Sequence, residues 1–113
     1  MSTSYTQAQL AGLMQAASES ARRAAAAIMA IYEGGFEVSE KADLTPLTAA
    51  DMASHRILES ELGALDATAL ALSEESSPER FAQRHSARRL WLIDPLDGTR
   101  EFVKRNGEFC INI

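Results

Sequence analysis

The sequence has one cysteine, no long apolar run and fewer basic than acidic side chains, and each scarcity excludes a class of protein. Because Cys110 is alone, the chain forms no internal disulfide, which fits a reducing compartment, and its apolar neighbours predict a small buried side chain. The longest apolar run, at residues 24–32, falls short of the ~20 residues that span a bilayer. No basic start followed by an apolar stretch marks a signal peptide. We therefore expect a cytoplasmic protein without a transmembrane segment, while peripheral association with the inner membrane stays open.

The net charge of −5 argues against a general nucleic-acid binder, because such proteins need a basic surface. The charge is uneven: residues 79–105 hold seven basic and four acidic side chains, a balance of +3, which leaves −8 for the rest of the chain. Several of these cations flank the acidic segment that begins at residue 94. They are Arg88, Arg89, Arg100, Lys104 and Arg105. They are either solvated surface charges or groups that attract a polyanionic substrate.

With 113 residues, of which 46% are hydrophobic, the chain is one small globular domain or part of a larger one. Apolar residues at three- and four-residue spacing, most of them alanine, predict a helix over Gln7–Glu33 that ends at Gly34. The alternation in FEVSEK predicts a half-exposed strand at residues 36–41, followed by a loop at residues 42–46.

The second half of the chain alternates helical and strand patterns, with no internal repeat. We expect a helix at residues 48–65, a short strand at 67–72 and a buried strand at 89–93. Residues 74–86 are polar and irregular, or form a brief helix after Pro78. A short helical turn at residues 98–105 and a last strand at 108–113 complete the expected order.

The segment LWLIDPLDGTREF at residues 90–102 carries the most specific chemistry. It places Asp94 and Asp97 three residues apart across a proline, at the end of an apolar β-type run. Hard divalent cations bind carboxylate and carbonyl oxygen, and the backbone of Gly98 and Thr99 offers N–H groups to a phosphate. The alternative is an ordinary turn, since Asp, Pro and Gly are common turn residues.

Two further acidic motifs admit both a structural and a functional interpretation. Glu74 and Glu75 follow the expected strand at residues 67–72. They are either solvated loop residues or ligands at the carboxyl end of a strand, where binding sites form. Thr48 and Asp51 fit a capping box at the start of the second helix, which would also hold Asp51 rigidly.

Three segments, TPLTAAD at 45–51, LSEES at 72–76 and DPLDGTREFVKRNGEF at 94–109, together resemble the signature of the inositol monophosphatase superfamily. Arg100-Glu101, where inositol monophosphatases carry Thr-Asn, and KRNGEF at 104–109 resemble the branch of 3'(2'),5'-bisphosphate nucleotidases of the CysQ type. The resemblance implies an α+β fold, the layered α-β-α-β-α sugar-phosphatase arrangement. This chain, residues 1–113, is then expected to be the N-terminal part of a single domain, with the C-terminal part missing.

The resemblance implies a site that holds two or more magnesium ions. Asp94 would bridge two ions, Asp97 would ligate the second, and the Leu96 carbonyl would ligate the first. Glu74 would be a further ligand and Glu75 a supporting residue. The implied substrate-binding set is Glu74, Leu96, Asp97, Gly98 and Thr99.

The resemblance assigns catalysis to Asp51 and Thr99. The Thr99 hydroxyl would contact the attacking water and link it by hydrogen bonds to Asp51, which is general-base assistance on a water made acidic by a metal. Lys41 and Asp43 are weak candidates for a loop that closes over the site, or else belong to a solvated turn. His55 and His85 match no ligand pattern; His55 is expected at the surface or in packing.

The implied reaction removes the 3'-phosphate of 3'-phosphoadenosine 5'-phosphate and gives AMP and phosphate, with lithium as an inhibitor. The expected partner is therefore a small phosphorylated nucleotide, not nucleic acid, and the oligomeric state is open. One alternative is inositol monophosphatase or fructose-1,6-bisphosphatase activity, against which Arg100-Glu101 argues. Another is metal binding without turnover, because the family draws a further aspartate and most nucleotide contacts from its C-terminal half.

Overall fold

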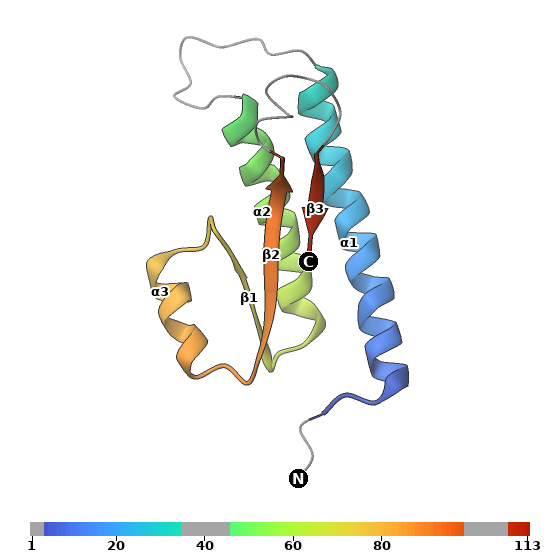
Figure 1. Ribbon diagram of the computed structural model, residues 1–113, viewed down its shortest axis with the longest axis vertical. Helices are drawn as coiled ribbons and strands as arrows, with labels where there is room; N and C mark the ends of the chain where they lie inside the picture. Colours follow the sequence, from blue (N-terminus) through green and yellow to red (C-terminus); the bar gives the residue numbers. More distant parts are fainter. Residues whose placement is uncertain (1–3, 35–45, 99–108) are drawn as a thin grey trace.

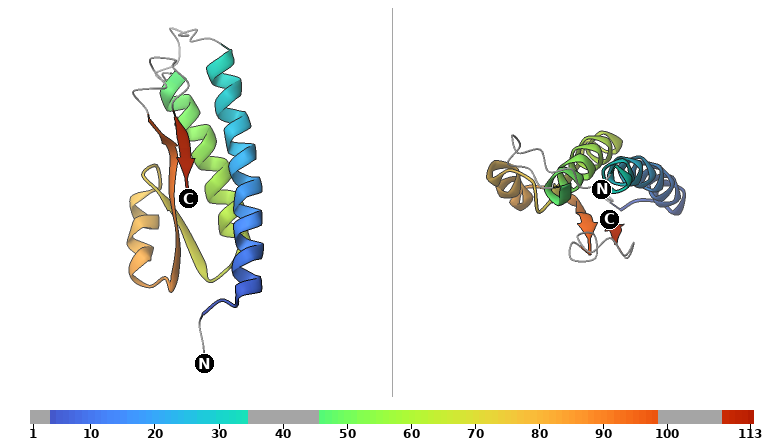
Figure 2. Two further views of the ribbon diagram at one scale, coloured as in Figure 1. Left: turned by 45° about the vertical axis from the view of Figure 1, so that its right-hand side comes forward. Right: turned by 90° about the horizontal axis from the view of Figure 1, so that it is seen from above.

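The computed structural model describes residues 4–34, 46–98 and 109–113. Helices α1 (Gln7–Glu33) and α2 (Pro46–Leu65) run antiparallel and cover one face of a three-stranded sheet (Figures 1 and 2). The short helix α3 (Pro78–Ala82) lies at the edge of the sheet next to β1, on the side away from α1. No helix within the described ranges combines the length and the apolarity that a bilayer crossing requires.

Helix α1 has the bounds that its apolar spacing predicts. A capping box starts it: the Gln9 N–H donates to Thr6 Oγ1 at 3.1 Å, and the Thr6 N–H donates to Gln9 Oε1 at 2.8 Å. These two bonds satisfy N–H groups that the first turn of a helix leaves without partners. The residues that α1 buries recur every three or four positions, and they are Ala17, Ser20, Ala24 and Ile28. Small residues in this stripe let α2 approach closely.

Helix α2 begins at Pro46, two residues before the predicted start. Thr48 is therefore the third helical residue and not the N-cap, so the predicted capping box of Thr48 and Asp51 is wrong. Proline suits the first turn of a helix because its ring presets φ and its missing N–H would have no intrahelical partner there. Asp51 consequently lies in the second turn of α2 and not in the first.

A polar tie joins the two long helices. Ser20 Oγ donates to Glu61 Oε1 at 2.8 Å, and the Arg23 guanidinium pairs with the same carboxylate. These contacts lower the pKa of Glu61, with the hydrogen bond from Arg23 as the largest cause. The tie joins α1 to the carboxyl-terminal half of α2, ten residues beyond Asp51.

The sheet has the strand order β1-β2-β3, built from β1 (Ala69–Ser73), β2 (Arg89–Asp97) and β3 (Cys110–Asn112). Strands β1 and β2 are parallel, in a register that runs from Ala69↔Arg89 to Ser73↔Ile93. The expected strand at 67–72 is thus confirmed, shifted by one or two residues. Strand β3 is antiparallel to β2.

The prediction that residues 89–93 form a buried strand is wrong for one face. Leu90 is 42% and Leu92 67% exposed, whereas Ile93 is 6% exposed, because α1 and α2 cover only one side of the sheet. Cys110 is also exposed, contrary to the buried thiol that its apolar neighbours predicted. It lies on β3, where successive side chains face opposite sides of the sheet, so apolar neighbours do not imply burial.

The connection between β1 and β2 contains the brief helix predicted after Pro78. Ser77 caps α3, its Oγ accepting the Arg80 N–H at 3.1 Å, and a 3₁₀ turn, η1 (Gln83–His85), follows. The expected strand at 36–41 and most of the expected turn at 98–105 lie outside the described residues.

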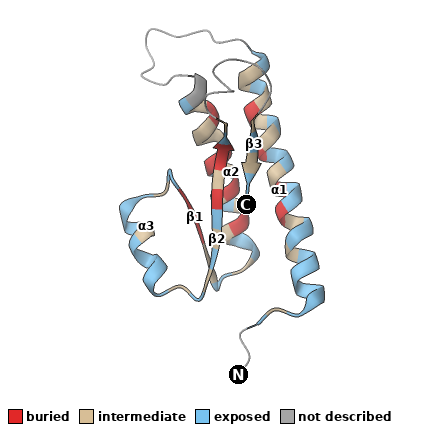
Figure 3. Cartoon of the chain, viewed as in Figure 1, coloured by how far each residue is buried: buried red, intermediate tan, exposed pale blue. Residues whose placement is uncertain are grey.

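The apolar core lies between the helices and the sheet (Figure 3). One cluster joins both helices to β1 and β2, and its members are Ala17, Ala24, Leu58, Leu62, Ala71 and Ile93. A second cluster lies nearer the carboxyl end of β2 and comprises Ile28, Ala50 and Leu96. The core therefore fixes α2 directly against the strand ends that carry the acidic motifs.

Leu58→Ala should lower the free energy of unfolding by about 3 kcal/mol, because Leu58 is fully buried and truncation leaves a cavity. Urea unfolding of the wild type and the variant measures the change. Leu65→Ala is the matched control: this side chain on the same helix is 38% exposed, so its loss should be below about 1 kcal/mol. Equal losses at the two positions would contradict the described packing.

Candidate metal centre

The acidic residues gather where the two parallel strands end. Because Ser73 pairs with Ile93, the next residues, Glu74 and Asp94, leave the β1–β2 pair at the same level. The amino-terminal half of α2 passes this end of the sheet (Figure 1). Carboxyl ends of parallel strands are the usual place for binding sites, as the position of Glu74 after an expected strand had suggested.

The segment Asp94–Asp97 belongs to β2 and is not a turn after it. Asp94 pairs with Asn112 and Asp97 with Cys110, so β2 holds one extra residue between the two pairs, which is a bulge. Proline is tolerated in a sheet at such a bulge, and bulges re-aim side chains beside functional sites. Gly98 follows the end of β2, and its φ of 87° is one that L side chains rarely adopt.

Asp51 of α2 faces the acidic strand ends. Its pKa is raised to about 6, first by burial and then by the negative charges of Glu75, Asp94 and Glu74. Like charges raise the pKa of a carboxyl group because they disfavour its ionised form. The structure thus brings together Asp51, Glu74 and Asp94, which come from three different elements.

The charge of this group fits a divalent cation. Among the described residues, no ion pair joins a Lys, Arg or His to Asp51, Glu74, Glu75 or Asp94. Carboxylates crowded without a counter-ion repel one another, and a bound cation relieves that repulsion. Carboxylate oxygens are also the ligands that magnesium prefers.

The side chains are not arranged as a ready-made cage. In the described part of the chain, no three His, Cys, Asp or Glu side chains form a group that could hold a metal ion as they stand. The Asp97 carboxylate has another partner: it accepts a hydrogen bond from Asn112 Nδ2 at 2.9 Å, and the residue is exposed. It is not among the charges that raise the pKa of Asp51.

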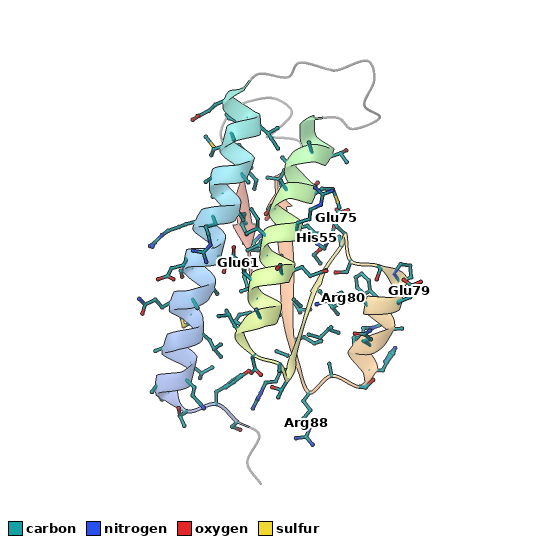
Figure 4. The ribbon with its side chains drawn as sticks, turned by 180° about the vertical axis from the view of Figure 1, so that it is seen from behind. His55, Glu61, Glu75, Glu79, Arg80 and Arg88 are labelled. Carbon is teal, nitrogen blue, oxygen red and sulfur yellow. The ribbon has the colours of Figure 1, made fainter. Side chains whose placement is uncertain are left out.

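Leu96 and Glu75 have clear structural surroundings. The Leu96 side chain is 2% exposed and packs in the core with Ile28 and Ala50. The Glu75 N–H donates to Ser73 Oγ at 3.1 Å, which holds the turn after β1. Glu75 lies near His55 at this end of the sheet (Figure 4). The charge of Glu75 raises the pKa of Asp51 more than the charge of Glu74 does. The sequence did not indicate this difference.

Ser54, His55 and Ser73 contribute contacts behind the site and were missed or given no role by the sequence. Ser54 Oγ donates to the Pro95 carbonyl at 2.7 Å, and His55 Nδ1 lies 2.6 Å from Ser73 Oγ. The expectation that His55 serves packing is confirmed, since it is 7% exposed. Spacing along the sequence could have pointed to Ser54 and His55. They follow Asp51 by three and four residues, so Asp51, Ser54 and His55 share one face of α2.

Arg88 and Arg89 do not flank the acidic site, contrary to expectation. Arg89 begins β2 and Arg88 precedes it, and Figure 4 shows Arg88 well separated from Glu75, at the other end of the β1–β2 pair. The Arg89 guanidinium lies 3.9 Å from the Tyr5 ring centroid and 3.6 Å from the Asp66 carboxylate. Arg89 therefore ties the N-terminal segment to the turn before β1.

The other predicted residues lie outside the described ranges. These are Thr99, Lys41, Asp43, Arg100, Lys104 and Arg105. His85 lies in η1 and is exposed.

Asp51→Asn should raise the free energy of unfolding of the metal-free protein at pH 7.5. An acid whose folded pKa of about 6 exceeds its ordinary value destabilises the fold when ionised. This destabilisation is full above pH ~6 and disappears as the pH falls toward ~4. After discounting for partial exposure, we expect a gain of about 1–2 kcal/mol at pH 7.5 and little at pH 4. Urea unfolding in the presence of EDTA measures the difference.

Asp66→Asn is the matched control, for which the change in stability is expected to have the opposite sign. The pKa of Asp66 is lowered to about 2, mainly by hydrogen bonds from Thr68 and Tyr5, so its ionised form supports the fold above pH ~4. Removing that charge should lower stability at neutral pH. An Asp51→Asn variant no more stable than the wild type at pH 7.5 would contradict the crowding of charge at the strand ends.

Comparison with known proteins places this arrangement in a family. Residues 9–113 match the inositol monophosphatase family. The chain is 48% identical over 95 residues to the 3'(2'),5'-bisphosphate nucleotidase CysQ of Escherichia coli K12, which covers 82% of this chain and 38% of that protein. The protein of the same name from Aggregatibacter actinomycetemcomitans is 37% identical over 99 residues, or 88% of this chain and 37% of its own length.

The fold is similar to that of a solved relative. The crystal structure of CysQ from Bacteroides thetaiotaomicron, described as a bacterial member of the inositol monophosphatase family, matches with a TM-score of 0.73 and 41% identity. The match covers 90% of this chain and 36% of that one. This chain thus spans little more than a third of the relatives it matches. Its α+β fold, its acidic strand ends and these matches show that the chain belongs to the inositol monophosphatase family.

Proposed function

We propose that this chain forms the N-terminal part of a single-domain, magnesium-dependent phosphatase. Its substrate would be 3'-phosphoadenosine 5'-phosphate, which it would convert to AMP and phosphate. The observation that carries the proposal is the group of carboxylates at the ends of β1 and β2, in a chain 48% identical to enzymes named 3'(2'),5'-bisphosphate nucleotidase. A protein of the relatives' length that contains this chain is called the full-length protein below.

Four groups would hold the magnesium ions: the Glu74, Asp94 and Asp97 carboxylates and the Leu96 carbonyl. When bound, magnesium would supply positive charge to the attacking and leaving oxygens of the phosphoryl transfer. Glu74 and Asp94 are already at one level of the sheet. Asp97 would exchange its hydrogen bond from Asn112 for this role.

Asp51 and Thr99 would orient the attacking water. In this proposal the Thr99 hydroxyl accepts a hydrogen bond from the water and donates one to the Asp51 carboxylate. The position of Asp51 on a rigid helix beside Asp94 and Glu74 supports this role. Gly98 and Thr99 would offer backbone N–H groups to the phosphate.

The substrate assignment is tested by phosphate release from the full-length protein. The proposal predicts release from 3'-phosphoadenosine 5'-phosphate that depends on magnesium and stops with EDTA. Inositol 1-phosphate and fructose 1,6-bisphosphate are the comparison substrates, and a higher kcat/KM on either would replace the substrate assignment. Magnesium binding without release from any of the three would contradict the proposed phosphatase and leave a metal-binding protein.

Lithium should inhibit the full-length protein more strongly than sodium does at equal ionic strength. A monovalent ion in a magnesium position brings half the charge to the leaving oxygen, so turnover falls. Initial rates at fixed magnesium, with lithium chloride or sodium chloride added, provide the comparison. Equal effects of the two salts would indicate screening alone and count against the assignment.

A cytoplasmic location belongs to the same proposal, because the substrate is a soluble nucleotide. The described residues give no support to the peripheral membrane association left open by the sequence.

A further inference from the structure

We propose that Ser54 and His55 are positioning residues that set the distance between the two metal-carrying strand ends and thereby the affinity for metal. This inference rests on the proposed function of the site and concerns two neighbouring residues of α2 to which the family signature assigns nothing. Each makes one buried hydrogen bond to a different strand end. Together they act as a spacer between the segment after β1 and the bulge of β2.

The first contact fixes the bulge of β2. Ser54 is fully buried, and its hydroxyl donates to the Pro95 carbonyl at 2.7 Å. Pro95 lies between Asp94 and Leu96, and its side chain is buried too. A bulge leaves backbone groups without ladder partners, and an unpaired buried carbonyl is costly. The Ser54 hydroxyl satisfies this carbonyl and so favours one conformation of the segment that carries Asp94.

The second contact fixes the turn after β1. His55 Nδ1 lies 2.6 Å from Ser73 Oγ, and both residues are buried. Ser73 Oγ also accepts the Glu75 N–H at 3.1 Å. Because Ser73 Oγ accepts from the Glu75 N–H, its own proton is free to be donated to His55 Nδ1. A neutral imidazole then carries its proton on Nε2, and this atom lies 3.5 Å from the Glu59 carboxylate. The position of the Glu74-Glu75 turn is thus linked to α2 through Ser73.

Glu59 holds the far side of the same turn. Its carboxylate accepts a hydrogen bond from Ser76 Oγ at 2.7 Å, and Ser76 Oγ accepts the Ser73 N–H at 3.0 Å. Arg80 Nε lies 3.5 Å from the same carboxylate and donates to the Ala71 carbonyl at 2.8 Å. The turn that carries Glu74 is therefore held at both ends, and one α2 face provides Asp51, Ser54, His55 and Glu59.

The Ser73, His55 and Glu59 side chains also have the composition of a nucleophilic triad. Ser73 is 3% exposed and its Oγ is engaged by the Glu75 N–H. An activated serine must be open to substrate, so burial excludes this interpretation. The same burial suits a positioning role, because residues that orient metal ligands typically change metal affinity 10–100-fold when they are mutated.

Titration with Mn²⁺ alone, followed by loss of its free electron paramagnetic resonance signal, tests the role in the full-length protein without turnover. Ser54→Ala and His55→Leu should raise the dissociation constant by about tenfold or more. His55→Asn keeps a polar atom at the δ position that faces Ser73, so it should stay within about threefold of the wild type. This rescue separates the hydrogen bond from the bulk of the ring.

Ser20→Ala is the matched control. Ser20 is also buried on a long helix, and its hydroxyl donates to Glu61 at 2.8 Å, but Glu61 lies ten residues beyond Asp51 on α2 and so at a distance from the site. It should lower the melting temperature as Ser54→Ala does, while Mn²⁺ affinity changes by less than about twofold. Circular dichroism confirms that each variant is folded at the titration temperature.

The outcomes separate the positioning role from the proposed function. Wild-type affinity in both Ser54→Ala and His55→Leu, or an equal loss in Ser20→Ala, would overturn the positioning role. Tight Mn²⁺ binding by the wild type without phosphate release would contradict only the phosphatase proposal. A wild type that binds no Mn²⁺ would overturn both.

Discussion

Asp94→Asn in the full-length protein should lower kcat by more than about 100-fold, or roughly 2.7 kcal/mol of barrier. In the proposal Asp94 would help to hold both magnesium ions, so neutralising it should weaken the binding of both. The fold should survive, because Asp94 is one of the charges that raise the pKa of Asp51, and its removal relieves repulsion in the metal-free protein. Steady-state phosphate release at saturating magnesium, together with urea unfolding in EDTA, measures both effects.

Glu74→Gln and Glu75→Gln form the matched pair for this prediction. Both neutralise a glutamate of the turn after β1, but only Glu74 is a proposed ligand. Glu74→Gln should resemble Asp94→Asn, whereas Glu75→Gln should lose less than about tenfold, or 1.4 kcal/mol. If Asp94→Asn keeps more than a tenth of the wild-type kcat, or if Glu75→Gln is the more damaging change, the ligand assignment is wrong.

Thr99→Ala should lower kcat by about 10²–10⁴-fold while leaving the affinity for magnesium nearly unchanged. Its proposed task is to orient the attacking water and to link it to Asp51, and neither task holds the metal. Initial rates as a function of magnesium concentration separate kcat from the concentration of half-saturation.

Thr99→Ser is the control, since it keeps the hydroxyl and should keep most of the rate. A Thr99→Ala variant whose magnesium affinity falls as much as its turnover would place Thr99 among the metal-binding residues and contradict the assigned role.

Local sequence patterns predicted the helices and strands well where one face of an element decides its structure. The spacing of apolar residues predicted α1 with its observed bounds. The predicted start of α2 was wrong by two residues. The Thr48–Asp51 pattern is typical of a helix start, but Pro46 is also suited to the first turn of a helix, and α2 begins there. The exposure of Leu92 and Cys110 depends on which face of the sheet is covered, and apolar neighbours in the sequence carry no information on that.

The candidate site was predictable where the chain order implies proximity. Strand ends that follow parallel strands meet at one edge, and the register of β1 and β2 brings Glu74 and Asp94 to the same level. Arg89 was misjudged because it is close to Asp97 in sequence but lies at the other end of β2, about 26 Å away at the usual rise per residue. The contacts of Ser54 and His55 depend on how α2 packs across the sheet, which no local pattern encodes.

The most direct test of the metal centre is an anomalous difference map from crystals of the full-length protein soaked in Mn²⁺. The account predicts a peak between the Glu74 and Asp94 carboxylates, where the pairing of β1 with β2 ends, with oxygen ligands around the ion. A peak elsewhere in the fold, with these two carboxylates unchanged, would contradict it.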